Sequence, residues 1–286
     1  MIPTSFEYEQ AETVAQAISK LLESSGEAKL LAGGHSLLPM MKLRLSSPEK
    51  LIDISGIKEL HGIVRDPDAL VVGALTTHAE VASSRMVRDT LPLLADAAGK
   101  IGDLQVRNRG TVGGNLAHAD MASDLPAVAL ALDAEITVET PHGTEVIPVD
   151  EFLLGPLITA LPENSVLKNV RFKIPQKGFN SVYEKISHPA SGYAVVGIAA
   201  VIACDDNNVV TQAAIGVTGA GDVAYRAKAV EEALLGKVFT EDVIRHASEL
   251  AADDGVIAGD LYASENYRRQ LCKVHTARAL RRVAPL

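Results

Sequence analysis

The chain has 286 residues, of which 47% are hydrophobic and 22% charged, and its formal net charge at pH 7 is −9. This length is enough for a large core and for two domains, and the composition is that of an ordinary globular protein. The acidic balance, with Lys and Arg scattered along the chain, argues against nucleic-acid binding as the main role. The longest apolar run, 194–204, is too short for a transmembrane helix, and the first eight residues lack the pattern of a secretory signal. We therefore expect a cytoplasmic protein.

The sequence carries no metal-ligand set and no catalytic machinery of its own. Its two cysteines, Cys204 and Cys272, are too few and too far apart to hold an iron–sulfur cluster or zinc. They are expected as buried thiols in a reducing compartment. No nucleophile elbow and no paired-carboxylate pattern occurs. A bound cofactor that carries its own chemistry would account for this absence.

A β/α unit is predicted around a first pair of glycines. A short strand at 30–31 leads into Ala32-Gly33-Gly34-His35-Ser36, and Ser36 is suited to cap a helix that runs to Leu45. A second strand is expected at 51–54. Paired glycines let the backbone approach a ligand, and the N–H groups at a helix start favour an anion.

A second pair of glycines has the same chemistry. It lies in Thr111-Val112-Gly113-Gly114-Asn115, after Arg107 and Arg109, and Ser123-Asp124 then begins a helix. One such segment alone would be weak evidence, because a glycine-rich bend between helices with surface arginines would also explain it. Two such segments with matching residues favour a clamp around a diphosphate.

The rest of the chain is divided by a candidate linker, beyond which the pattern becomes simpler. Hairpins are predicted near 63–74 and 136–149 and a strand at 166–174, and Pro175 to Asn180 is a candidate linker. Beyond it the apolar pattern predicts three strands followed by three helices, namely strands near 181–187, 194–204 and 209–218 and helices near 226–235, 240–253 and 264–282.

One later motif imitates a dinucleotide-binding loop. The run from Gly219 to Ala224 fits G-x-G-x-x-A between a strand and a helix. A Rossmann unit also needs a parallel strand after that helix, ending in an acidic residue. After Gly236 the chain instead enters another helix, so the motif is expected to be a structural turn.

Taken together, the segments 32–39 and 105–115 resemble the flavin subunits of molybdenum hydroxylases, in particular the medium-subunit type of carbon monoxide dehydrogenase. These belong to the xanthine dehydrogenase family. The resemblance extends over essentially the whole chain, and further motifs fall in the family's order, namely Asp124-Leu125-Pro126, Tyr183-Glu184-Lys185, Tyr193-Ala194, Arg226-Ala227 and Ser264-Glu265-Asn266-Tyr267-Arg268.

The resemblance implies an α+β fold with two domains. Residues 1–176 would form an FAD-binding domain of the vanillyl-alcohol-oxidase (PCMH) type, made of two α/β subdomains at about 1–55 and 56–176. Residues 177–286 would form a C-terminal domain with a three-stranded antiparallel sheet and a helical bundle.

It also implies the residues that hold FAD. Backbone N–H groups would bind the diphosphate together with the Ser36, Thr111 and Asn115 side chains, in the segments Ala32, Gly33, Gly34, His35 and Ser36 and Thr111, Val112, Gly113, Gly114 and Asn115. Asp124 would be a nearby polar contact, Leu167 and Lys185 would approach the flavin, and Tyr193 would lie against its ring. Many relatives have basic residues after the lysine and Asp before the tyrosine; this chain has His188, Pro189 and Gly192, a difference that bears on flavin shielding.

The implied activity is electron transfer within a larger complex. A molybdopterin-containing large subunit would oxidise the substrate, a small subunit would carry two [2Fe–2S] clusters, and FAD in this chain would pass the electrons to an external acceptor. The resemblance further implies a dimer of heterotrimers. Two alternatives remain: a stand-alone FAD reductase or oxidase of the same fold, and an assembly protein that has lost FAD. The sequence names neither the substrate nor the acceptor.

Overall fold

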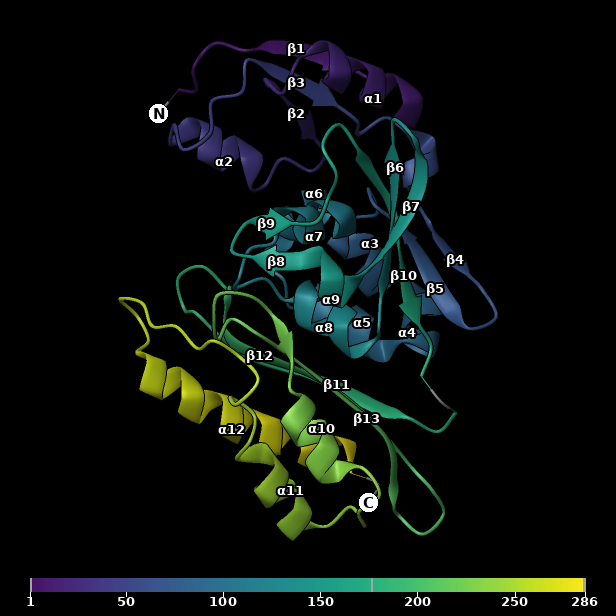
Figure 1. The fold of residues 1–286 in the computed structure, drawn as a ribbon, viewed down its shortest axis with the longest axis vertical. Helices are drawn as coiled ribbons and strands as arrows, with labels where there is room; N and C mark the ends of the chain where they lie inside the picture. Colours follow the sequence, from purple (N-terminus) through teal and green to yellow (C-terminus); the bar gives the residue numbers. More distant parts are fainter. Residues whose placement is uncertain (1, 176, 285–286) are drawn as a thin grey trace.

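The computed structural model describes residues 2–175 and 177–284, whose three larger sheets are stacked along the long axis of the molecule (Figure 1). A small parallel sheet lies at one end, a five-stranded sheet with its helices lies in the middle, and an antiparallel sheet backed by helices lies at the other end. Within the described residues, no helix is long and apolar enough to cross a membrane.

The first sheet is the predicted β/α unit. Its strands β1 (Glu7–Gln10), β3 (Lys50–Asp53) and β2 (Ala28–Leu31) are parallel and lie in that order. Helix α1 (Val14–Glu23) begins at Thr13, whose side chain accepts a hydrogen bond from the Gln16 N–H, and it buries its apolar stripe. Helix α2 (Leu37–Lys42) begins after Ser36 as predicted but ends earlier than expected.

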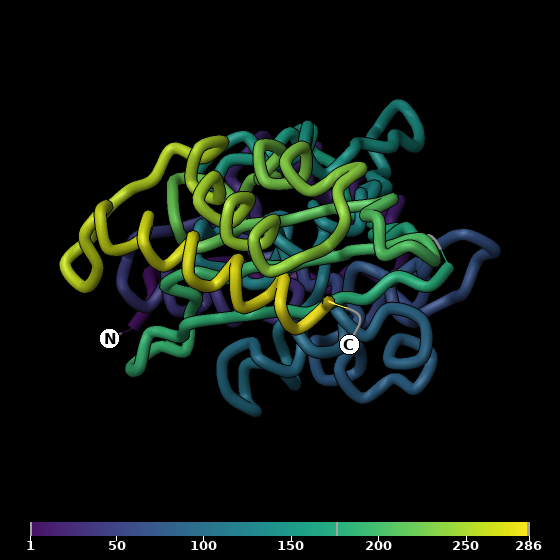
Figure 2. The backbone as a smooth tube through the Cα atoms, turned by 90° about the horizontal axis from the view of Figure 1, so that it is seen from below, coloured from purple at the N-terminus to yellow at the C-terminus, as the bar shows by residue number. Residues whose placement is uncertain are grey.

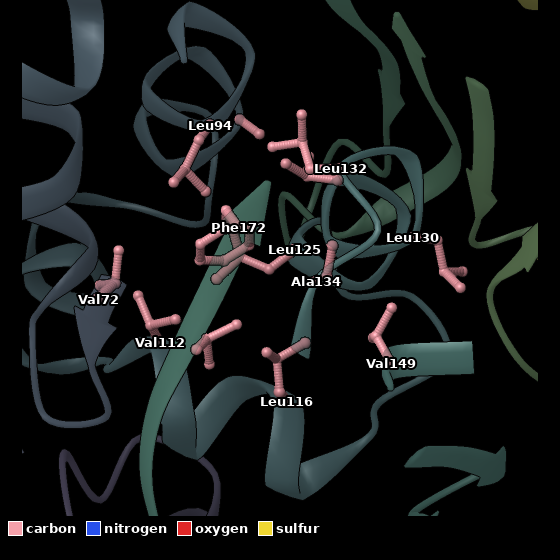
Figure 3. Close-up of a cluster of buried hydrophobic side chains, with 14 of the residues drawn as sticks. Val72, Leu94, Val112, Leu116, Leu125, Leu130, Leu132, Ala134, Val149 and Phe172 are labelled. Atoms are coloured by element: carbon pink, nitrogen blue, oxygen red, sulfur yellow. The ribbon is translucent and has the colours of Figure 1, made fainter. Parts of the chain in front are cut away.

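The five-stranded sheet has the order β4-β5-β10-β6-β7. Its strands are β4 (Ile63–Arg65), β5 (Ala69–Gly73), β10 (Val166–Lys173), β6 (Glu135–Thr140) and β7 (Gly143–Pro148). The main core forms between this sheet and its helices, where Phe172 of β10 is fully buried among Leu94, Val112 and Leu125 (Figure 3).

Short helices fill the connections of this middle region. They are η1 (Lys58–Leu60), α3 (His78–Ser83), α4 (Arg85–Thr90), α5 (Pro92–Gly99), α6 (Leu104–Arg109), α7 (Val112–His118), α8 (Leu125–Ala131) and α9 (Val149–Phe152). A small hairpin, β8 (Leu153–Gly155) and β9 (Ile158–Thr159), follows α9. The second glycine pair therefore lies inside the first turn of α7, and not in an open loop.

The C-terminal sheet is antiparallel and has four strands in the order β11-β12-β13-β14. They are β11 (Asn180–Ser187), β12 (Ala194–Cys204), β13 (Val210–Thr218) and the two-residue β14 (Tyr225–Arg226), so the three expected strands gain a short fourth. Helices α10 (Lys228–Leu234), α11 (Glu241–Ser248) and α12 (Glu265–Val283) cover one face (Figure 2). The expected linker at 175–180 includes residue 176, which lies outside the described residues.

Burial on both faces explains the continuous apolar run in β12. Ala199 and Val201 belong to the main core on the side of the five-stranded sheet, whereas Ile198 and Ala200 pack among the C-terminal helices. Successive side chains of a strand point to opposite faces, so a strand covered on both sides is apolar throughout. The C-terminal sheet thus packs against the middle region on one face and against its own helices on the other.

Candidate cofactor site

The second glycine segment, residues 111–115, is held in place by residues 74–78, which we call the bracing segment. The two run antiparallel, with hydrogen bonds from the His78 N–H to the Gly110 carbonyl (3.0 Å), from the Val112 N–H to the Thr76 carbonyl (3.0 Å) and from the Gly113 N–H to the Ala74 carbonyl (2.8 Å). A Cβ on Gly113 would lie 2.6 Å from the Cβ of Ala74. Only glycine permits this approach.

Thr111 caps helix α7. Its Oγ1 accepts a hydrogen bond from the Gly114 N–H at 3.2 Å, and the Asn115 N–H donates to its carbonyl. All four N–H groups from Val112 to Asn115 therefore donate inside the protein. The Asn115 Oδ1 accepts from the Ser123 hydroxyl at 2.7 Å. Gly114, unlike Gly113, is exposed. The second glycine segment therefore offers a ligand a smooth surface and polar side chains rather than unpaired backbone N–H groups.

The first glycine segment, residues 32–36, lies directly beside the second. A Cβ on Gly33 would stand 1.9 Å from the Arg109 carbonyl oxygen, and one on Gly114 would lie 3.9 Å from the Cβ of Ala32. Gly34 adopts a positive φ of +75°, which favours glycine. Two segments about 80 residues apart in sequence thus form one continuous surface.

The free backbone donors belong to the first glycine segment. Across the described part of the chain, no protein group accepts from the N–H groups of Gly33, Gly34, His35 or Ser36. Ser36 is the N-cap of α2, but its hydroxyl caps no backbone group. Successive N–H groups left unpaired in a turn form a concave site for an anion. The donor set fits a diphosphate.

Asp124 and Lys185 form a buried ion pair at the junction of the middle and C-terminal regions. The Lys185 Nζ lies 2.9 Å from the Asp124 carboxylate, and the two side chains are 3% and 4% exposed. The Tyr183 hydroxyl donates to the same carboxylate at 2.5 Å, and Lys185 donates to the Lys100 carbonyl at 3.1 Å. Burial raises the pKa of Asp124, and the Lys185 ammonium opposes that rise. This cluster ties α8 to β11.

Leu167 and Tyr193 occupy different surroundings. Leu167 is buried in β10, beside a register shift between Leu167 and Asn169. Tyr193 precedes β12 and is 43% exposed, and burial together with nearby Asp120 raises the pKa of its hydroxyl. Its carbonyl accepts from the His188 N–H at 2.8 Å.

An aromatic pair that the sequence did not predict lies beside Tyr193. The rings of His188 and Tyr262 have centroids 4.3 Å apart. This contact joins the turn after β11 to the segment before α12, about 70 residues later. No local pattern in the sequence brings the two together, because their proximity depends on how the C-terminal sheet and helices pack.

The G-x-G-x-x-A motif is a structural turn, as predicted. A Cβ on Gly221 would lie 2.0 Å from the Val256 carbonyl oxygen, so protein backbone occupies the place of a ligand. The guanidinium of Arg268, from α12, donates to the carbonyls of Gly219 and Val195 and pairs with Asp260. In the described residues no group of three His, Cys, Asp or Glu is placed to hold a metal ion.

Comparison with known families gives a match over nearly the whole chain. Residues 4–177 match the model of the FAD binding domain in molybdopterin dehydrogenase, and residues 181–283 match the CO dehydrogenase flavoprotein C-terminal domain. The chain belongs to this family. The predicted α+β fold and its assignment as an FAD-binding subunit of an oxidoreductase are confirmed.

Individual members of the family are similar over their full length. The carbon monoxide dehydrogenase medium chain of Hydrogenophaga pseudoflava is 40% identical over 98% of this chain and 97% of its own. The glyceraldehyde dehydrogenase medium chain of Sulfolobus acidocaldarius is 33% identical over 99% of this chain and 100% of its own.

Solved structures agree with the described fold. A carbon monoxide dehydrogenase from Hydrogenophaga pseudoflava, which lacks the Mo-pyranopterin moiety of its cofactor, superposes with a TM-score of 0.95 at 41% identity, covering 99% of this chain and 98% of that one. Quinoline 2-oxidoreductase from Pseudomonas putida 86 gives a TM-score of 0.93 at 29% identity, with coverage of 99% and 98%.

Proposed function

We propose that this flavoprotein is the electron-transfer subunit of a heterotrimeric molybdenum hydroxylase. A molybdopterin-containing large subunit would withdraw electrons from the substrate, and the [2Fe–2S] clusters of a small subunit would carry them to this chain. This chain would then pass the electrons to an external acceptor. The observation that carries this proposal is the full-length similarity to medium chains of such enzymes, combined with an unpaired row of N–H groups where the two glycine segments meet.

We propose that the first glycine segment binds the FAD diphosphate. Gly33, Gly34, His35 and Ser36 supply backbone N–H donors, and the Ser36 hydroxyl supplies another. Ala32 would join this segment to the second glycine segment, which would shape the opposite wall. There Thr111, Val112 and Gly113 would fix the backbone, exposed Gly114 would allow close approach and the Asn115 side chain would face the ligand.

The remaining predicted residues would define the flavin end of the site. Tyr193 presents a partly exposed ring that suits stacking on a flavin. Three of the predicted residues have buried side chains, namely Asp124, Lys185 and Leu167. Their proposed contribution is to shape and polarise the wall behind the flavin. His188, Pro189 and Gly192 in the adjacent turn would set access to the ring.

FAD, when bound, supplies the ability to take up two electrons and release them one at a time or in pairs. The chain itself has only to bind and orient it, in keeping with the absence of a predicted catalytic residue. The substrate is set elsewhere, because relatives of similar length are named for carbon monoxide, glyceraldehyde and caffeine dehydrogenases. A cytoplasmic location stays a prediction, as do the domain boundaries at 55 and 176 and the dimer of heterotrimers.

Purification of this chain alone and from its host tests the proposal. The lone chain should show flavin absorbance without iron, and the host preparation should contain molybdenum and iron–sulfur subunits. A chain that never retains flavin would overturn the proposal. Turnover by the lone chain with an organic substrate would instead favour the stand-alone FAD reductase or oxidase.

A further inference from the structure

We infer that His78, a residue outside both glycine segments, is the positioning residue that fixes the spacing between them and so sets the affinity for the FAD diphosphate. The inference rests on the proposed FAD site. The inference is supported by contacts between the bracing segment and the residues that adjoin the two glycine segments.

His78 is buried against Gly110, the residue that precedes the second glycine segment. His78 is 2% exposed. A Cβ on Gly110 would lie 2.9 Å from Cδ2 and 3.0 Å from Nε2 of the His78 ring. Its backbone N–H donates to the Gly110 carbonyl at 3.0 Å. The ring therefore limits how far Gly110 and its neighbours can sink toward the core.

The position of Gly110 is transmitted to the first glycine segment through Arg109. The Arg109 carbonyl is the group that Gly33 contacts so closely that no side chain fits between them. Gly110 itself also lies against the first segment, since a Cβ on Gly33 would stand 3.2 Å from the Gly110 Cα. His78 thus packs against Gly110 at the point where the two glycine segments meet.

Local structure holds the imidazole in place. Thr77 caps α3, its Oγ1 accepting from the Glu80 N–H, while the Glu80 carboxylate accepts from the Thr77 N–H at 2.7 Å. This capping box fixes the first turn of α3, which begins at His78. The Nδ1 of His78 is buried, and no group in the described part of the chain forms a hydrogen bond with it. Burial of a polar nitrogen without a hydrogen bond lowers the stability of the folded chain. We therefore attribute the buried ring to the shape that it gives this site.

The chain offers a matched control. His275 of α12 is also a buried imidazole, 4% exposed, but its Nδ1 lies 3.6 Å from the Glu184 carboxylate and it belongs to the C-terminal helices, away from both glycine segments. His78→Ala and His275→Ala each remove one buried imidazole ring. His78→Gln retains a side chain that reaches the position of Nε2 and serves as the conservative variant.

The affinity of the full chain for FAD and for ADP, measured well below the unfolding temperature, tests the inference. Loss of the ring should raise the dissociation constant of both ligands about tenfold in His78→Ala, because both carry the diphosphate. His78→Gln should recover most of the affinity, and His275→Ala should bind as the unmodified chain does. Unchanged affinities in a folded His78→Ala chain, or an equal loss in His275→Ala, would overturn the inference.

Hydrogen exchange on the unmodified chain provides a test that does not depend on the folding of a variant. Added FAD should slow amide exchange at the His78 and Val112 N–H groups, which link the bracing and second glycine segments, as well as at 33–36. Protection confined to 33–36 would contradict the role of His78 while leaving the FAD site intact. Absence of any protection, with no flavin retained, would count against the proposed function itself.

Discussion

Gly33 lies against the carbonyl oxygen of Arg109, so that a Cβ on Gly33 would stand 1.9 Å from that oxygen. This contact converts two separate glycine pairs into one surface. It also assigns distinct tasks to them: the first carries unpaired N–H groups, and the second carries the wall against which they are placed.

Gly33→Ala should separate the two glycine segments and abolish FAD retention. The clash is with backbone, which cannot move aside as a side chain would, so the loss should appear in the flavin absorbance of the purified chain. Gly56→Ala is the matched control, because nothing lies within 4 Å of its Cβ position. Equal flavin content in both variants would contradict the contact between the segments.

The two glycines of the second segment should respond differently to alanine. Gly113→Ala forces a clash with Ala74 and should lower the free energy of unfolding of the apoprotein by about 2 kcal/mol or more. Gly114→Ala brings its Cβ to 2.7 Å from the Thr111 hydroxyl, which caps α7, on the exposed side of the segment. It should weaken FAD binding, while displacement of the cap should lower apoprotein stability by only about 1 kcal/mol. Denaturant unfolding and FAD titration of both variants separate the two effects, and a reversed order would mean that FAD does not approach Gly114.

The buried Asp124–Lys185 pair should be costly to break on one side. Among the described residues, Lys185→Met leaves the buried Asp124 carboxylate with the Tyr183 hydroxyl as its one remaining side-chain hydrogen-bond partner, so the unfolding free energy should fall by about 3–5 kcal/mol. Adding Asp124→Asn should restore part of that loss. The exposed Arg85–Asp89 pair is the control, and its removal should cost at most about 1 kcal/mol. A small effect of Lys185→Met would show that water reaches the carboxylate.

His78 should make stability depend on pH in a defined window. Burial lowers its pKa from 6.5 to about 4, so between these values the unfolded chain binds more protons than the folded one. The contribution of His78 to the unfolding free energy is fully present above pH 6.5 and is lost as the pH falls toward 4. It amounts to about 3 kcal/mol across this window. His78→Gln lacks this contribution. Parallel pH profiles of unfolding free energy for the two chains would contradict it.

Arg268 should be essential to the turn that carries the G-x-G-x-x-A motif. Arg268→Met removes the donors to the Val195 and Gly219 carbonyls and should lower the unfolding free energy by about 2–3 kcal/mol. Arg269→Met, next in the helix but 41% exposed with a pair to Glu265, should cost less than about 1 kcal/mol. Comparable losses in the two variants would rule out a special role for the turn.

The sequence by itself determined the elements and the cofactor class. Hydrophobic periodicity predicted the β/α unit, both hairpins and the long strands of the C-terminal sheet, because local spacing sets which residues can share a face. Glycine pairs beside Ser36 and Thr111 indicated a diphosphate clamp for a similarly local reason. The turn at Gly219 was also assigned correctly from the elements that follow it.

Only the tertiary structure decided how these parts work together. The contact of Gly33 with Arg109, the brace at His78 and the pairing of Asp124 with Lys185 each join residues between about 30 and 80 positions apart. It also showed that the N–H groups of the second glycine segment are already used, since their acceptors lie partly in the bracing segment. Such relationships depend on packing between elements, which no local spacing in the sequence encodes.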